Sequence, residues 1–179
     1  MSQPPHRIVP VTKSQVEHLQ EISRTTFTET FARHNTEENM RAYLDSAYHV
    51  DKLRQEIDNP ESQFFFIYHD SEPQGPPVGY LKLNIGAAQS EPMGADHLEL
   101  ERIYIRAAHK RQGLGKALYD LTERRAREEN KRYIWLRVWE HNTAAKEFYS
   151  SLGFREIGDH IFPVGDDPQR DILMEKDTR

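Results

Sequence analysis

Residues 103–121, with the sequence IYIRAAHKRQGLGKALYDL, constrain the fold more than any other stretch of the chain. An apolar run rich in β-branched residues ends in a basic turn that carries Gly113 and Gly115, and apolar residues then recur at helical spacing. A chain that passes from a strand through a glycine turn into a helix gathers backbone N–H groups at the helix N-terminus, where an anion binds favourably. The stretch therefore predicts an anion-binding turn between a strand and a helix.

Two common phosphate-binding loops do not fit this turn. The dinucleotide fingerprint requires a third glycine three residues after the second, and this position is Leu118. The Walker pattern requires glycine at the position of Lys110 and Ser or Thr at the position of Ala117. What remains is a basic residue, two further residues and Gly-x-Gly at the start of a helix. By itself this pattern is equally typical of an ordinary turn.

Hydrophobic periodicity predicts an alternation of strands and helices along the chain. Strands are predicted at residues 6–12, 62–69, 78–86, 97–105, 133–139, 154–165 and 169–176. Helices are predicted at residues 13–31, 35–48, 49–60, 114–130 and 142–153, with Asn35 or Thr36 as a cap and Gly153 as a C-terminal stop. The order predicts a mixed α/β sheet with helices on both faces, in one domain that covers residues 1–179.

Composition narrows the class of protein. The chain has 179 residues, of which 36% are hydrophobic and 30% charged, which is typical of a globular domain. No apolar run approaches the roughly 20 residues of a membrane span, and the N-terminus has no apolar signal region, so we expect a cytoplasmic protein that does not bind membranes. Cysteine is absent, which excludes disulfides and thiol nucleophiles.

The net charge and its distribution along the chain indicate which classes of partner to expect. The net charge of −5 fits either an ordinary acidic surface or attraction of a cationic substrate. Nucleic acid is not expected as a partner because basic residues do not form a face separate from the acidic ones. The nine histidines form no metal-binding motif, so no metal site is predicted.

The strand His97–Ile105 carries two carboxylates. Strict alternation predicts Leu98, Leu100, Arg102 and Tyr104 on one face, with Glu99, Glu101, Ile103 and Ile105 on the other. Carboxylates among apolar residues indicate the lining of an active site, and two solvated strand carboxylates are the simpler alternative.

The glycine turn and a second motif together resemble the GNAT superfamily of acetyl-CoA-dependent N-acetyltransferases. LERIYIRAAHKRQGLGKAL is followed, in the order and at the separation found in the family, by WLRVWEHNTAAKEFYSSLGF. The second run contains an N-x-x-A-x-x-F-Y-x-x-x-G-F frame, here Asn142, Ala145, Phe148, Tyr149, Gly153 and Phe154. The resemblance implies a single-domain GNAT-like fold, with a mixed, mostly antiparallel twisted sheet and a V-shaped splay between the two central strands.

The resemblance also implies how acetyl-CoA would bind. The family's loop cradles the pyrophosphate of the cofactor, and it matches Lys110, Arg111, Gln112, Gly113, Leu114, Gly115 and Lys116. The backbone of Ile103, Tyr104 and Ile105 would pair with the pantetheine arm like an added strand, and Asn142, Ala145 and Tyr149 would contact the cofactor. The family usually has Gln or Arg where this chain has Lys110, which keeps the charge but loses the forked donor of Arg.

Acetyl transfer to an amine needs a base for the amine, donors for the developing oxyanion and an acid for the leaving thiolate. Tyr149 is the predicted acid because it lies two helical turns after Asn142 on the same face; the alternative is an aromatic packed beside Phe148. Glu99 and Glu101 are the candidate bases, either directly or through ordered water. In histone-type members the base matches Glu99, and other members carry an acid at the place of Glu101.

The stretches TFTETFARHNTEENMRAYL and VWEHNTAAKEFYSSLGFREIGDHIFPVGDDPQRDILM resemble the bacterial PaiA-like branch, which acetylates spermidine and spermine. An aromatic and acidic pocket for such a small-molecule amine would use Phe27, Phe31, Tyr43 and Glu29, with Tyr48 and Asp45 nearby; plain core is the simpler alternative for the aromatics. Asp166 and Asp167 lie in a loop that would also face a cation, and solvated turn carboxylates are the simpler alternative for them. Protein or peptide N-acetyltransferase and a CoA-binding regulator without catalysis are the alternatives. A homodimer is left open.

Overall fold

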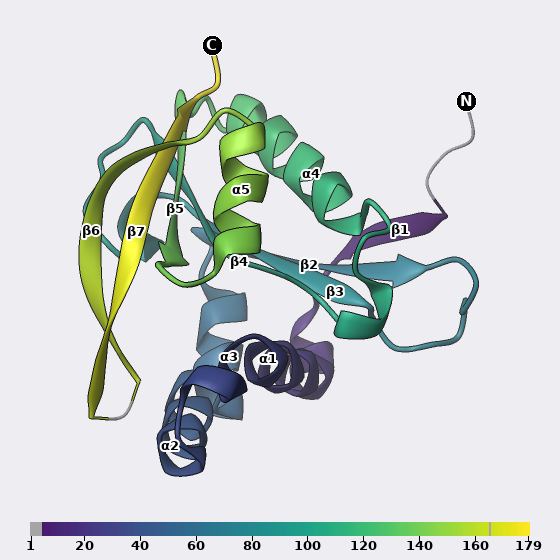
Figure 1. The fold of residues 1–179 in the computed structure, drawn as a ribbon. Coiled ribbons are helices and arrows are strands. Elements are labelled where there is room, and N and C mark those ends of the chain that lie inside the picture. Colours follow the sequence, from purple (N-terminus) through teal and green to yellow (C-terminus); the bar gives the residue numbers. More distant parts are fainter. Residues whose placement is uncertain (1–4, 165) are drawn as a thin grey trace.

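The computed structural model describes residues 5–164 and 166–179. Within them, seven strands form one sheet in the order β1-β2-β3-β4-β5-β7-β6, and every neighbouring pair is antiparallel except β4 and β5 (Figure 1). The strands are β1 (His6–Pro10), β2 (Ser62–His69), β3 (Gly79–Asn84), β4 (His97–Ile105), β5 (Tyr133–Trp139), β6 (Arg155–Val164) and β7 (Asp167–Asp177). The predicted mixed, mostly antiparallel sheet is confirmed. Gly165, predicted as the end of the sixth strand, lies outside the described residues.

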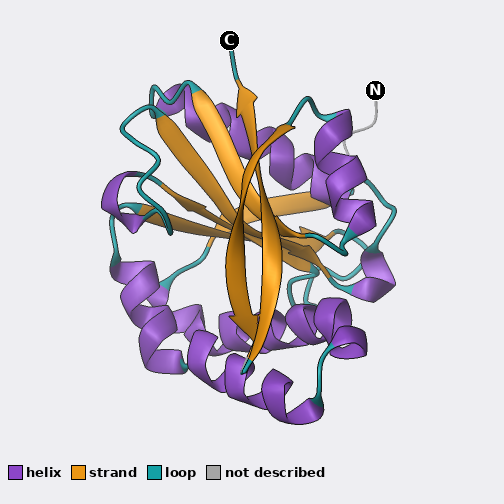
Figure 2. Cartoon of the chain, turned by 60° about the vertical axis from the view of Figure 1, so that its left-hand side comes forward, coloured by secondary structure: helices purple, strands orange, loops and turns teal. Residues whose placement is uncertain are grey.

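Helices cover both faces of the sheet, as predicted (Figure 2). The helices α1 (Val16–Phe31), α2 (Glu37–Ala47) and α3 (Val50–Asp58) lie on one face, and α4 (Leu114–Glu128) and α5 (Thr143–Ser151) lie on the other. Thr36 is the cap of α2, because its hydroxyl accepts a hydrogen bond from the Asn39 backbone at 3.1 Å. Gly153 follows α5 with φ +100°, the left-handed conformation that ends a helix.

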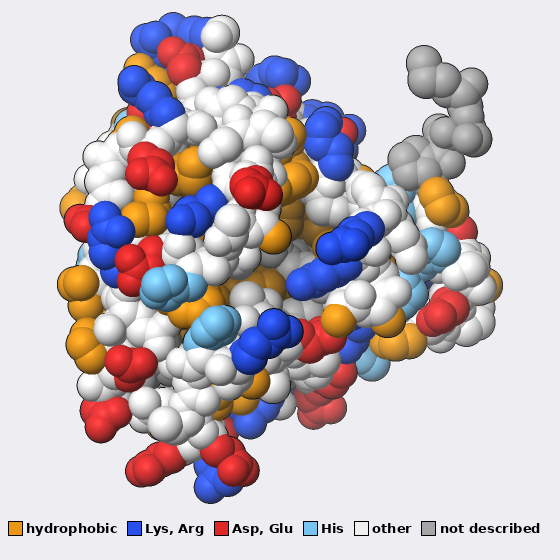
Figure 3. Space-filling view, viewed as in Figure 1, with side chains coloured by type: hydrophobic (Ala, Val, Ile, Leu, Met, Phe, Trp, Pro, Cys, Tyr) orange, Lys and Arg blue, Asp and Glu red, His pale blue; other side chains and the backbone are white. Residues whose placement is uncertain are grey.

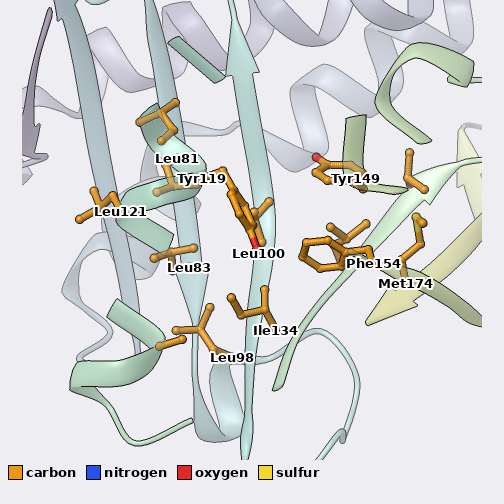
Figure 4. Close-up of a cluster of buried hydrophobic side chains, with 14 of the residues drawn as sticks. Leu81, Leu83, Leu98, Leu100, Tyr119, Leu121, Ile134, Tyr149, Phe154 and Met174 are labelled. Carbon is orange, nitrogen blue, oxygen red and sulfur yellow. The ribbon is translucent and has the colours of Figure 1, made fainter. Parts of the chain in front are cut away.

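Each face of the sheet has its own hydrophobic core. Leucine and isoleucine side chains from β3, β4 and β5 pack with α4 and α5 on one side (Figure 4). The core under α1, α2 and α3 is richer in aromatic residues. The buried side of α1 includes Val16, Leu19, Ile22, Ser23, Thr26 and Phe27.

A β-bulge in β4 makes the predicted faces of this strand wrong. Lys82 of β3 pairs with Arg102, but Leu83 pairs with Leu100, so Glu101 is an extra residue in β4. The extra residue shifts the alternation by one position. Leu98, Leu100, Ile103 and Ile105 therefore pack on the α4 side, while Glu99, Glu101, Arg102 and Tyr104 face the side of α1, α2 and α3.

The V-shaped splay is confirmed immediately beside this bulge. The parallel strands β4 and β5 pair only between His97–Glu99 and Tyr133–Trp135. Beyond these three positions the strands separate, because a bulge bends its strand and increases the local twist. The backbone edges of both strands that face the gap are therefore without a strand partner from this point on.

Candidate active site

A cleft of about 850 Å³ passes through the sheet where β4 and β5 separate. The turn that leads into α4 and the start of α5 line one part of the cleft, which we call the α4 end. Side chains of α1, α2 and α3 line the other part, which we call the α1 end. Figure 3 shows the hollow between α5 and the turn into α4, with Lys and Arg side chains at its border.

The N-terminus of α4 is open toward the cleft. Gly113 precedes the helix with φ +79° and provides no side-chain cap, whereas side chains of Thr36, His49 and Asn142 cap α2, α3 and α5. The first N–H groups of a helix have no partner within the helix. A Cβ atom built at Gly113 would meet nothing within 4 Å, so the turn leaves room for a ligand against its backbone. Free donors at a positive helix end fit a pyrophosphate.

Basic side chains and a free strand edge continue this surface. Lys110, Arg111 and Lys116 line the cleft, as do Leu114 and Gly115, whereas Gln112 does not. Ile103, Tyr104 and Ile105 line it from the edge of β4 that has no strand partner. An extended amide-containing chain can pair with such an edge like an added strand.

Tyr149 lines the cleft from α5 in an apolar setting. Its side chain is 7% exposed, and its ring centroid lies 5.5 Å from that of Phe148 and 5.7 Å from that of Phe154. Figure 4 shows the hydroxyl pointing away from Phe154. Burial raises the pKa of Tyr149, so the hydroxyl keeps its proton at neutral pH. Among the described residues the hydroxyl has no hydrogen-bond partner, which leaves the proton available to a ligand.

Asn142 and Ala145 lie beside Tyr149 at the start of α5, and both line the cleft. The Asn142 side-chain oxygen accepts a hydrogen bond from the Ala145 backbone at 3.2 Å, which caps α5. The amide nitrogen of Asn142 is not used by this cap. The predicted frame is thus assembled at the α4 end of the cleft.

The two candidate carboxylates have opposite electrostatic environments. Burial and the neighbouring Glu101 raise the pKa of Glu99, against hydrogen bonds from Ser90 and Asn84 that lower it. Burial would also raise the pKa of Glu101, but Arg102 and Lys82 hold it at about 2. The Lys82 Nζ and Arg102 Nε atoms lie 3.0 Å and 2.9 Å from Glu101 oxygens. Glu101 is therefore a fixed anion, while Glu99 binds a proton more readily than an ordinary carboxylate.

The α1 end contains three of the four side chains predicted to bind a substrate. Phe27, Phe31 and Tyr43 pack in the aromatic core and also line the cleft, and contact with a substrate stays a prediction. The structure does not bring Glu29 to the cleft, because its carboxylate accepts a hydrogen bond from the Ala107 backbone at 3.1 Å on the surface.

Two further acidic candidates are also engaged outside the cleft. Asp45 pairs with Arg24 at 3.1 Å, and Asp167 accepts a hydrogen bond from Gln169 at 2.9 Å. Neither lines the cleft. Glu29, Asp45 and Asp167, which were predicted to face a cationic substrate, therefore do not line the cleft.

Further charges at the α1 end come from residues that the sequence did not single out. Glu56 of α3 pairs with buried Lys82 at 3.3 Å and with Arg102 at 3.4 Å. Asp171 of β7 and Arg137 of β5 line the cleft 4.0 Å apart, and burial raises the pKa of Asp171 to about 6. In the sequence, Lys82, Arg137 and Asp171 are charged residues in strands and Glu56 lies in a helix, and hydrophobic periodicity does not show that these residues meet in the fold.

A model of the acetyltransferase (GNAT) family matches residues 17–154. The chain belongs to the GNAT family. It is therefore an N-acetyltransferase, an acyltransferase that uses acetyl-CoA as its cosubstrate.

Relatives and solved structures agree with this assignment along nearly the whole chain. An uncharacterized N-acetyltransferase of Lactobacillus delbrueckii subsp. lactis is 42% identical over 95% of this GNAT chain and 96% of its own length. The spermidine N(1)-acetyltransferase of Thermoplasma acidophilum is 24% identical over 90% of each chain. A crystal structure of the PaiA N-acetyltransferase from Thermoplasma acidophilum in complex with coenzyme A has a TM-score of 0.77 at 24% identity and covers 99% of each chain.

The structural likeness to the Thermoplasma enzyme, at 24% identity, concerns the fold. In the described part of the chain, no helix has the length and apolar character needed to cross a bilayer.

Proposed function

We propose that this GNAT enzyme transfers the acetyl group of acetyl-CoA to a primary amine of a small polycation such as spermidine or spermine. The observation that carries the proposal is the continuity of the cleft, which joins the open N-terminus of α4 to a pocket with carboxylates at the α1 end. An amine entering from the α1 end meets a thioester held at the α4 end within the splay. Direct attack in a ternary complex then needs no covalent intermediate on the enzyme.

The α4 end holds the cosubstrate in this proposal. The backbone N–H groups at Gly113, Leu114 and Gly115, with the nearby basic side chains, would bind the pyrophosphate. The free edge of β4 would pair with the pantetheine amides and supply a donor for the negative charge that develops on the carbonyl oxygen. Acetyl-CoA itself supplies the activated acetyl group.

Glu99 and Tyr149 move the protons. An alkylammonium has a pKa near ~10.4, so its proton must be removed before the nitrogen can attack. Glu99 takes this proton as the general base, since its raised pKa brings it closer to the working pH than an ordinary carboxylate. As the C–N bond forms and the C–S bond breaks, the Tyr149 hydroxyl donates its proton to the leaving sulfur.

The polycation part of the proposal is supported by two observations. Glu56, Glu99 and Asp171 border the α1 end, and the whole chain carries a net charge of −5. The Thermoplasma relative that is 24% identical is a spermidine N(1)-acetyltransferase.

Arg137 favours a second candidate, a peptide or amino acid whose carboxylate accompanies the amine. This guanidinium lines the α1 end, and its single ion-pair partner among the described residues, Asp171, is 4.0 Å away, beyond hydrogen-bond distance. Arg102 is different, because Glu101 and Glu56 already neutralise it. A carboxylate is the ligand that an open guanidinium binds best.

A panel of acceptors decides between the candidates. Thiol release from acetyl-CoA is measured with spermidine, spermine, free amino acids and short peptides at low and high salt. The proposal expects polyamines to have the highest kcat/KM and to lose affinity with salt, because exposed charges are screened over ~10 Å at 0.1 M. Peptides acetylated well while polyamines are not would establish the second candidate. Bound acetyl-CoA with no acceptor at all would make the chain a cofactor-binding regulator.

A further inference from the structure

The proposed base borders the cleft but is almost completely buried. Glu99 is 1% exposed, and its carboxylate is held by neighbours on β3 and on the loop between β3 and β4. The Asn84 amide donates to it at 2.9 Å, but an amide NH2 group only donates hydrogen bonds and cannot take up a proton from an amine and pass it on. A substrate amine in the cleft therefore has little direct access to the Glu99 carboxylate, and an exposed group bonded to it would be easier to reach.

Ser90 occupies this position. It is exposed, it lines the cleft, and its Oγ atom donates a hydrogen bond to Glu99 Oε2 at 2.5 Å. The Ser90 backbone N–H donates to Glu99 Oε1 at 2.8 Å, so the serine is held to the carboxylate at two points. A hydroxyl that donates its one proton still has two lone pairs with which to accept another.

The loop that carries Ser90 is fixed across the splay. Gln89 accepts a hydrogen bond from the buried Trp135 indole at 2.8 Å and donates to the Gly86 and Gly94 carbonyls. Glu91, the next residue, lies 3.0 Å from His160 of β6. These contacts tie the loop to β5 and β6, which holds the hydroxyl of Ser90 in place beside Glu99.

We propose that Ser90 relays the proton of the acceptor amine to Glu99. One N–H bond of the ammonium breaks as an O–H bond forms at Ser90 Oγ, and the original O–H bond of Ser90 breaks as its proton passes to Glu99 Oε2. Ser90 ends as a neutral hydroxyl, Glu99 ends as a carboxylic acid, and the amine is left with the lone pair that attacks the thioester. The inference rests on the proposed role of Glu99 as base.

Other charged groups near this part of the cleft do not offer the same path. They are Lys82 of β3, Glu101 and Arg102 of β4, Glu56 of α3, Arg137 of β5 and Asp171 of β7. Four of them are tied together in ion pairs around Glu101, and neither Arg137 nor Asp171 contacts Glu99. Ser90 is the hydroxyl that joins Glu99 to the cleft within the described residues.

The test compares Ser90→Ala, Ser90→Thr and Glu99→Gln with the parent enzyme, using the best acceptor of the panel. Ser90→Ala removes the relay but keeps the backbone contact, and we expect kcat to fall about tenfold to a hundredfold. This loss is smaller than the full effect of losing a base, because water can partly replace the hydroxyl. Ser90→Thr keeps a hydroxyl and is expected to retain most of the rate. Ser71→Ala, in the exposed turn after β2, is the matched control and is expected to leave kcat unchanged.

A pH profile separates a relay from a merely structural contact. The Ser90 hydrogen bond lowers the pKa of Glu99. If this contact were only structural, losing it would shift the acidic limb of the kcat profile to higher pH and leave the plateau intact. Loss of the relay lowers the plateau itself, with the melting temperature and the KM for acetyl-CoA unchanged. If Ser90→Ala does not fold, Ser90→Gly takes its place.

Each result is decisive. A Ser90→Ala plateau within twofold of the parent, beside a Glu99→Gln enzyme that has lost its activity, overturns the relay and keeps the base. A loss in Ser90→Thr as large as in Ser90→Ala also overturns the relay. A fully active Glu99→Gln enzyme overturns the base and the relay together, while the acceptor panel still reports whether acetyl transfer occurs.

Discussion

The α4 end and the α1 end of the cleft are built from different kinds of group. At the α4 end, the donors are mostly backbone N–H groups that an uncapped helix and an unpaired strand edge leave free. At the α1 end, side chains from α1, α2, α3, β4, β5 and β7 converge. Backbone donors bind the same phosphate and amide groups in any sequence that makes the turn, whereas converging side chains can select one acceptor from many. Cosubstrate binding and acceptor choice are therefore physically separable in this fold, and the proposed catalytic pair, Glu99 and Tyr149, lies between them.

Glu99→Gln is expected to have the largest effect on rate. It removes the proposed base without changing the size of the side chain, so kcat should fall ~10²–10⁴-fold while both KM values change little. Stopped-flow or steady-state thiol release measures the loss. A comparable loss of affinity for acetyl-CoA or for the amine would show that Glu99 belongs to a binding site, and would contradict the separation of catalysis from binding at the two ends of the cleft.

Glu101→Gln is the matched control for Glu99→Gln, and its effect should appear in stability. Removing this anion leaves buried Lys82 with fewer counterions, which costs about 3 kcal/mol. The folded pKa of about 2 lies below the ordinary value of 4.5, so this stabilisation is present above about pH 4.5 and is lost as pH falls toward 2. Denaturant unfolding across this range should show a steeper acid loss in the parent than in Glu101→Gln, and equal slopes would contradict the assignment.

Tyr149→Phe should lower kcat about a hundredfold, at the low end for a general acid because a thiolate leaves readily without a proton. The ring and its packing against Phe148 and Phe154 remain, so acetyl-CoA affinity and melting temperature should be near those of the parent. Tyr68→Phe, outside the cleft, is the control. A parent-like rate would show that Tyr149 only packs, and weaker acetyl-CoA binding would place it among the binding groups.

Gly113→Val acts on the α4 end alone. A residue with a Cβ atom at φ +79° is strained by ~1–2 kcal/mol, and its side chain projects into the space next to the turn. We expect the KM for acetyl-CoA to rise about tenfold or more, with the KM for the amine unchanged. Calorimetry with acetyl-CoA measures the binding directly. Gly158→Val is the control, because a Cβ atom there also meets nothing within 4 Å but φ is not left-handed. Unchanged acetyl-CoA binding in a folded Gly113→Val protein would show that the loop is an ordinary turn.

The smallest effect is expected at the α1 end, from Asp171. With a pKa of about 6, its carboxyl is charged at about pH 8 and mostly protonated at about pH 5. The loss of this charge should raise the KM for a polyamine about threefold to fivefold, the size of a partly solvated charge pair. Asp171→Asn should have the high KM at both pH values, while the KM for acetyl-CoA stays constant. A pH-independent KM in the parent would remove Asp171 from the acceptor site.

Much of the fold was predictable because its signals are local. The cap at Thr36, the buried stripe of α1 and the bounds of β2, β4 and β5 follow from spacings of a few residues. The faces of β4 were not predictable, because the extra residue Glu101 appears only when the register against β3 is known. Glu29 was misassigned for a related reason: its partner, the Ala107 backbone, is far away in the sequence.

The sequence by itself determined the family, the cosubstrate and the layout of the α4 end, since the glycine turn and the Asn142–Tyr149 frame each span a few consecutive residues whose backbone geometry is local. Only the tertiary structure decided how Glu99 and Glu101 differ, and that Ser90, Arg137 and Asp171 border the same cleft. The physical reason is that a pKa and a pocket depend on burial and on charges contributed by distant segments. Such quantities exist only once the chain has folded.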